Sequence, residues 1–300
     1  MSKIQEALKR LQKSGSPVDS PSKTLRNQIR IEQSRSDSIP RAKTPIVPGA
    51  IHHVELDELA ARGLIAPPAH VQLVADEFRR IKRPLIKNAF AKPDTSFDHA
   101  NVLMVTSGLP KSGKTFCAVN LGISIAMERE LNVLLVDADV AKPQVSRAFG
   151  LDDTRGLIDL LMEDGSEVES AVIRTDLHDI HVLPAGRAHP QATELLASSR
   201  MSEVIDDLAK RFPDRLIIID SPPLLMTSEA QAIASQVGQI VLVVEYGKTS
   251  HETVHEALEL LDTSKAINAI VNKSQHWSHG GYYGSGYGYF DDEGNKREED

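Results

Sequence analysis

The residues best suited to chemistry lie in the sequence GLPKSGKT, from Gly108 to Thr115, which fits the phosphate-binding pattern GxxxxGK[ST]. Its glycines allow the backbone to curl so that successive N–H groups face phosphate oxygens. Lys114 is expected to reach the β- and γ-phosphates of a nucleoside triphosphate, and the Thr115 hydroxyl to bind Mg²⁺. The alternative is a glycine-containing turn that happens to include lysine and threonine.

Carboxylates follow two other apolar runs of the chain. Asp137 and Asp139 come after residues 133–136, and Asp220 comes after residues 216–219. In open α/β sheets, ligands bind at the carboxyl ends of the strands, so these side chains are expected beside the phosphate loop. Asp137 and Asp220 are predicted to join Thr115 around Mg²⁺, either directly or through water. An aspartate after a strand can also simply cap a turn.

The elements that must position these residues alternate along the chain. Short apolar runs predict buried strands, and the segments between them have helical spacing. This alternation predicts a doubly wound, mostly parallel α/β sheet with right-handed crossovers. The predicted strands are residues 102–105, 133–136, 180–183, 216–219, 240–244 and 267–271, and the predicted helices are residues 116–129, 193–212 and 251–261.

Composition divides the chain into five parts. A short amphipathic N-terminal helix precedes a linker rich in Ser, Pro, Lys and Arg, which is typical of disorder. A helical segment then leads to the nucleotide-binding core, and a flexible tail follows it. Within the helical segment, helices are predicted over residues 56–62 and 70–83, with Pro84 ending the second. The five parts are residues 1–13, 14–50, 51–99, 100–275 and 276–300.

The tail holds four of the chain's five tyrosines, in the sequence GGYYGSGYGYF. Interleaved glycines leave these hydroxyls mobile and exposed. Such a tail can stack on nucleic acid, associate with itself or accept phosphoryl groups. Six acids against two bases in the last ten residues argue against a nucleic-acid partner, because they repel phosphates. The four tyrosines are Tyr282, Tyr283, Tyr287 and Tyr289.

The overall composition suits a globular protein built on aliphatic packing. The 300 residues include one cysteine and 4% aromatics, and the formal net charge is -8. A single cysteine excludes an internal disulfide, and no run approaches the roughly 18 apolar residues of a membrane span. A reducing, cytoplasmic location is therefore expected.

The motifs, in this order, resemble those of the bacterial tyrosine autokinases (BY-kinases) of exopolysaccharide synthesis and export. Residues 108–115 resemble the family's Walker A motif, residues 133–143 its Walker A′ motif and residues 216–223 its Walker B motif. The resemblance covers about residues 71–290 and implies a P-loop NTPase fold of the MinD/ParA-like type. Within the family, the N-terminal sequence, the linker and the segments EFRRIKRPL and PAGRAHPQATELLASSRM look most like the free-standing kinases associated with exosortases.

The resemblance implies roles for two further groups of residues. The four tail tyrosines are expected to be phosphoacceptors, modified chiefly by neighbouring subunits. Glu77, Arg80 and Arg83 look by spacing alone like a solvated helix face, but they match the family's E-x-x-R-x-x-R helix and imply assembly into a ring. Two residues depart from the pattern: Lys111, where relatives commonly have glycine, and Lys142, where they commonly have arginine.

The activity implied by the resemblance is phosphoryl transfer from Mg·ATP to tyrosine. Lys114 and the loop N–H groups would hold the charge that develops on the γ-phosphoryl group. Free tyrosine has a pKa of about 10, so Asp137 or Asp139 is expected to act as the base, and spacing does not choose between them. Asn272 is expected near the adenine, although an asparagine at a strand end is more often a turn residue. The expected nucleotide-binding residues are Gly108, Lys111, Ser112, Gly113, Lys114, Thr115, Phe116 and Asn272.

Partners are implied in the same way. A free-standing kinase is expected to act with further copies of itself, a separate membrane chain-length regulator (a polysaccharide co-polymerase) and a tyrosine phosphatase. It would then lie at the inner membrane through that regulator. The alternatives are a partitioning or positioning ATPase of the same fold and a nucleotide-dependent scaffold without catalysis. Such ATPases carry a lysine directly after the first glycine of the loop, where this chain has Leu109.

Overall fold

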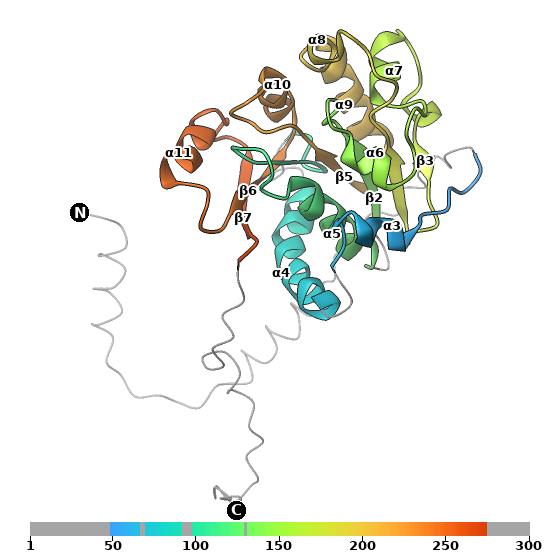
Figure 1. Ribbon diagram of the computed structural model, residues 1–300. Helices are drawn as coiled ribbons and strands as arrows, with labels where there is room; N and C mark the ends of the chain where they lie inside the picture. The colour runs from blue at the N-terminus through green and yellow to red at the C-terminus, as the bar shows by residue number, and fades with distance from the viewer. Residues whose placement is uncertain (1–48, 67–69, 92–97, 129–130, 275–300) are drawn as a thin grey trace, which may run out of the picture. The chain divides into compact units, whose positions relative to one another are not determined.

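The computed structural model describes residues 49–66, 70–91, 98–128 and 131–274 (Figure 1). The predicted N-terminal helix, the linker up to residue 48 and the tyrosine-rich tail lie outside these residues. Among the helices of the described ranges, none is long and apolar enough to cross a membrane.

A seven-stranded sheet forms the centre of the described region, with the strand order β3-β4-β2-β5-β1-β6-β7. Neighbouring strands pair in parallel except for β3, which pairs antiparallel with β4. All six predicted strands are confirmed, and only the two-residue β3 was not predicted, because so short a segment has no periodicity. The strands are β1 (Val102–Thr106), β2 (Asn132–Asp137), β3 (Ile173–Arg174), β4 (Ile180–Leu183), β5 (Arg215–Asp220), β6 (Gln239–Glu245) and β7 (Ala266–Asn272).

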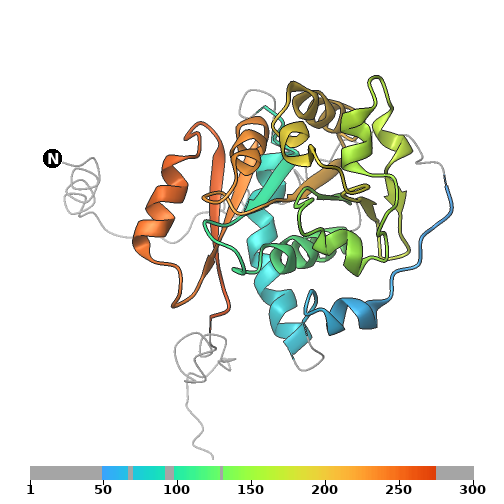
Figure 2. The same cartoon turned by 45° about the horizontal axis from the view of Figure 1, so that its top comes forward.

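Helices cover both faces of the sheet (Figures 1 and 2). On one face α5 packs against the central strands and α4 packs on α5, while α9 and α10 lie on the other face. The doubly wound arrangement is therefore confirmed. The helices are α3 (Leu56–Ala61), α4 (Val71–Ala89), α5 (Lys114–Ala126), α6 (Gln144–Ala148), α7 (Leu157–Met162), α8 (Ala192–Leu196), α9 (Ser199–Arg211), α10 (Ser228–Gln236) and α11 (His251–Glu259).

The strands are apolar on both faces because each face is covered by helices. In β1, Val102 and Met104 belong to the core cluster shared with α9 and α10. By the alternation of a strand, Leu103 and Val105 lie on the α5 side. All four side chains are buried, with at most 1% of their surface exposed. The continuous apolar runs in the sequence follow from this double covering.

Two predicted helix boundaries were wrong. Helix α4 does not stop at Pro84 but passes through it to Ala89. Proline removes one helical hydrogen bond, but the last turn is held from outside: Gln239 Nε2 donates to the Leu85 carbonyl over 3.1 Å. The single helix predicted over residues 193–212 is divided into α8 and α9, which are separated by residues 197 and 198.

A buried lysine ties α4 to α5. The Lys82 side chain is 6% exposed, and its Nζ donates to the Ser124 carbonyl of α5. The same ammonium group lies 2.8 Å from the Glu128 carboxylate. Because a buried ammonium group must keep its partners, α4 is fixed against the helix that follows the phosphate loop.

We predict that Lys82→Ala lowers the free energy of unfolding by about 1.5–3 kcal/mol, the usual cost of losing a hydrogen bond to a charged group. Urea denaturation followed by circular dichroism measures the change. Lys87→Ala, at an exposed position of the same helix, is the control and should stay within about 0.5 kcal/mol of the wild type. Equal stability of the Lys82 variant and the control would contradict a stabilising role for the contacts of Lys82 with Ser124 and Glu128.

Candidate nucleotide-binding and active site

The phosphate loop connects β1 to α5 and has a conformation that only glycine allows at one point. Gly113, at the N-cap of α5, has a left-handed backbone with φ 92°. A Cβ atom added there would lie 2.1 Å from Nδ2 of Asn272. The second glycine of the pattern is thus required both by backbone conformation and by the close approach of β7.

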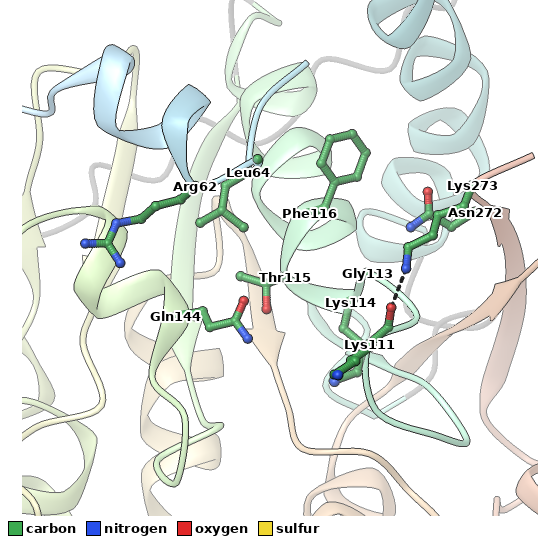
Figure 3. Close-up of a pocket in the computed structure, with 11 residues that line it drawn as sticks. Arg62, Leu64, Lys111, Gly113, Lys114, Thr115, Phe116, Gln144, Asn272 and Lys273 are labelled. Carbon is green, nitrogen blue, oxygen red and sulfur yellow. Dashed lines mark hydrogen bonds between the residues drawn. The ribbon is translucent and has the colours of Figure 1, made fainter. Parts of the chain in front are cut away.

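The end of β7 holds the loop from outside. Asn272 Nδ2 donates to the Ser112 carbonyl over 2.9 Å, and Lys273 Nζ donates to the Lys111 carbonyl over 2.6 Å. Figure 3 shows the second of these contacts across the mouth of the loop. Asn272, which was expected near the adenine, lines the pocket beside the loop, and its amide nitrogen donates to the loop backbone.

Lys111 has a positive φ of 69°, which explains why its position favours glycine. For a residue with a Cβ atom this left-handed conformation costs about 1–2 kcal/mol relative to the ordinary regions. The lysine at this position therefore strains the loop. The strain must be offset by contacts such as the one from Lys273.

A pocket of about 440 Å³ opens beside the loop (Figure 3). Six of the eight predicted nucleotide-binding residues line it, whereas Gly108 and Ser112 do not. The pocket suits a ligand with several phosphate groups, because lysines and loop backbone converge on it. The predicted residues in its wall are Lys111, Gly113, Lys114, Thr115, Phe116 and Asn272.

Of the five further residues in the wall, Lys273 follows Asn272 at the end of β7, and the other four carry no recognisable sequence pattern. Gln144 begins α6, and the stretch Arg62–Leu64 follows α3. The latter is held in place because Asn120 Nδ2 of α5 donates to the Leu64 carbonyl over 2.8 Å. The Arg62 guanidinium bonds Glu58 over 2.6 Å and extends away from the loop (Figure 3). These residues could not be found from the sequence, because they reach the loop only through tertiary packing.

Two predicted carboxylates meet behind the pocket. Asp137 of β2 and Asp220 of β5 are register partners, and both are fully buried. Thr115 donates its hydroxyl to Asp220 Oδ2 over 2.7 Å. Ser146 donates both its N–H and its Oγ to Asp137 Oδ2, each over 2.8 Å. The other oxygen of each carboxylate, Oδ1, has no hydrogen-bond partner within the described part of the chain.

Burial strongly favours the neutral form of both carboxyl groups. Burial, together with the neighbouring Asp220, raises the pKa of Asp137 to about 8. Burial also raises the pKa of Asp220 to about 7, although the Thr115 hydrogen bond and Lys114 act in the opposite direction. Burial raises the pKa of the half-exposed Asp139, while nearby Lys114 lowers it. Without a cation, the site is therefore short of positive charge.

The donor set fits Mg²⁺ rather than a fully protein-bound metal. No group of three or more His, Cys, Asp or Glu side chains that could hold a metal occurs in the ranges that the structure describes. Two unpartnered carboxylate oxygens and one hydroxyl match a cation that keeps several waters and also binds substrate phosphates. Asp137, Asp220 and Thr115 could supply those protein ligands.

The predicted assembly residues lie beside a second pocket, of about 560 Å³, between α4 and β7. Glu77 and Arg80 line this pocket and Arg83 does not, but all three side chains are exposed. Phe116 separates it from the nucleotide pocket and lines both. The four tail tyrosines lie outside the described residues.

Comparisons with known proteins match a domain family and several curated relatives. The AAA domain family matches residues 109–274. The chain is 34% identical to tyrosine-protein kinase YwqD of Bacillus subtilis, over 75% of this chain and 92% of YwqD. It is 32% identical to the succinoglycan biosynthesis transport protein ExoP of Rhizobium meliloti, over 58% of this chain but only 22% of ExoP. The chain also spans only about a quarter of the length of several other curated relatives.

The fold is similar to that of a solved kinase domain. The VpsO kinase domain superposes with a TM-score of 0.57 and 29% sequence identity, covering 70% of this chain and all of that domain. The P-loop class of fold predicted from the sequence is therefore confirmed.

The raised pKa values predict how the stability of the metal-free protein depends on pH. Both carboxyl groups have a higher pKa in the folded than in the unfolded chain. Their contribution to the free energy of unfolding is therefore fully present below about pH 4 and is lost as the pH rises through 7 to 8. Asp137→Asn removes one such group. We expect the free energy of unfolding of the variant, relative to that of the wild type, to increase by at least about 1.4 kcal/mol from pH 5 to pH 8.

Urea denaturation at pH 5, 6.5 and 8 in EDTA measures this gain. Asp153→Asn, at an exposed turn position, is the matched control and should follow the wild type at every pH. A constant difference between Asp137→Asn and the wild type across this range would refute the assignment of a buried neutral carboxyl group.

Proposed function

Because this chain belongs to the bacterial tyrosine-protein kinases, we propose that it transfers the γ-phosphoryl group of ATP to the tyrosines of its own C-terminal tail, chiefly between neighbouring copies. The observation that carries the proposal is the convergence of Lys114, Thr115, Asp137 and Asp220 at one edge of the sheet. A tail with four tyrosines follows β7 in the sequence, and the end of β7 contacts the loop.

Catalysis would consist mainly of positioning and charge stabilisation. The transferred group spreads negative charge over its oxygens, and Lys114 with the loop N–H groups would hold that charge. Mg²⁺, when bound, would neutralise part of the charge on the β- and γ-phosphates. Thr115, Asp137 and Asp220 would hold the cation, which fits their unpartnered oxygens.

The acceptor tyrosine must lose its proton during the transfer. Asp137 is the last residue of β2 and Asp139 follows two positions later, and we propose that one of these two carboxylates accepts the proton. They differ in access, because Asp137 is fully buried and Asp139 is half-exposed. If Asp137 accepts the proton, binding of nucleotide and acceptor must first rearrange the residues that cover it.

The environment of α4 supports assembly with further copies of the chain. Glu77, Arg80 and Arg83 are exposed, and within the described ranges none of them forms an ion pair. Charged side chains left available on α4, next to the pocket that shares Phe116 with the nucleotide pocket, suit a neighbour that must deliver its tail to the nucleotide. A ring of copies would give every subunit such a neighbour.

The polysaccharide role rests on the relatives. ExoP is named for succinoglycan transport and is several times longer than the region that this chain matches. We propose that this kinase acts in exopolysaccharide synthesis or export with a separate membrane chain-length regulator, at the inner membrane. A tyrosine phosphatase would reverse the modification.

We predict that purified protein incubated with Mg·ATP acquires phosphate on Tyr282, Tyr283, Tyr287 and Tyr289, as mapped by mass spectrometry. Lys114→Ala should reduce the initial rate by about 100-fold or more, because a group that stabilises the developing charge is lost. Tyr246→Phe is the control, since Tyr246 is the chain's remaining tyrosine and is exposed. ATP hydrolysis with an unmodified tail would contradict the kinase proposal and favour a positioning ATPase.

We also predict that Arg80→Ala combined with Arg83→Ala weakens self-association by about 10-fold or more, because interface arginines commonly contribute strongly to binding. Analytical ultracentrifugation over a concentration series measures this. Arg79→Ala is the matched control on the same helix, since Arg79 already pairs with Asp76 over 2.7 Å. Identical association of the double variant and the control would exclude this face of α4 as the interface.

A further inference from the structure

Two contacts from the end of β7 fix the orientation of two peptide groups in the phosphate loop. Lys273 Nζ holds the Lys111 carbonyl and Asn272 Nδ2 holds the Ser112 carbonyl. In a planar trans peptide the carbonyl and the next N–H point in opposite directions. The Ser112 and Gly113 N–H groups are therefore directed away from β7, toward the inside of the loop.

These N–H groups are available to a ligand. In the described part of the chain, neither of them donates to another residue. Backbone N–H groups that point together into a loop form an anion-binding concavity. The contacts from β7 thus act on the groups that would bind phosphate oxygens.

The contact from Lys273 matters because Lys111, whose carbonyl accepts it, has a strained backbone. Lys111 has φ 69°, in the region that glycine adopts readily and lysine rarely does. Without an external contact, the 111–112 peptide could relax to an ordinary conformation and turn the Ser112 N–H away from the ligand. A glycine at position 111 would need no such restraint.

Lys273 is itself held in place. Its Nζ lies 3.3 Å from the Glu245 carboxylate of β6, a side chain that is only 9% exposed. Lys248 pairs with the same carboxylate over 2.7 Å but does not contact the loop. The two lysines therefore share one anchor and differ in whether they reach Lys111, which makes Lys248 a matched control.

We propose that Lys273 is a positioning residue for nucleotide binding, which compensates for the strain at Lys111 by fixing the 111–112 peptide with its N–H toward the phosphates. This inference rests on the nucleotide site of the proposed function. It predicts that residues 273 and 111 are energetically coupled: Lys273 is needed when position 111 is lysine and is dispensable when it is glycine.

The test measures Mg·ADP binding to the full chain by isothermal titration calorimetry. Lys273→Met, which keeps the length of the side chain but loses the ammonium group, should weaken binding by about 10-fold, and Lys273→Arg should restore most of it. In a Lys111→Gly background, the same Lys273→Met change should alter the dissociation constant by less than about twofold.

Lys248→Met should bind Mg·ADP as the wild type does. This control distinguishes loss of the contact with the loop from the general effect of removing a lysine that pairs with Glu245. Two results would overturn the proposal. One is unchanged binding by Lys273→Met, and the other is an equal loss in both backgrounds, which would mean that Lys273 contacts the nucleotide directly. Failure of the wild-type chain to bind Mg·ADP would instead reject the nucleotide site itself.

Discussion

The parallel pairing of β2 with β5 is the constraint on which the candidate site depends. It places Asp137 beside Asp220, and strand alternation turns both toward the face covered by α5. Thr115, in the first turn of α5, can then reach Asp220. A slip of one residue in the pairing would move one carboxylate to the opposite face of the sheet. The packing of apolar side chains that specifies the register therefore also specifies the position of the two carboxylates.

This arrangement is unfavourable while the site lacks a cation. Two carboxyl groups share a buried edge, and each keeps one oxygen without a hydrogen-bond partner in the described structure. The surrounding apolar strands must supply the stability that holds them there. A protein with hydrogen-bonded amide side chains at these two positions would be more stable, but it would offer a cation less negative charge. The site therefore illustrates stability given up for function.

The sequence was sufficient for the features that depend on local pattern. The apolar runs predicted six strands, and the glycine pattern located the loop between β1 and α5. Features that depend on distant contacts were missed. Pro84 was predicted to end its helix, and the contact that holds the following turn, from Gln239 to the Leu85 carbonyl, comes from a residue more than 150 positions away. The pocket wall formed by Arg62–Leu64 and the restraint of Lys111 by Lys273 likewise have no signal in their own neighbourhoods.

The wall between the two pockets has a thermodynamic consequence. Phe116, Asn272 and Lys273 line both the nucleotide pocket and the pocket between α4 and β7. A molecule that shifts these side chains from one pocket changes the free energy of occupying the other, and linkage makes the effect equal in both directions. If nucleotide occupies the first pocket and a partner occupies the second, the shared wall would couple their binding.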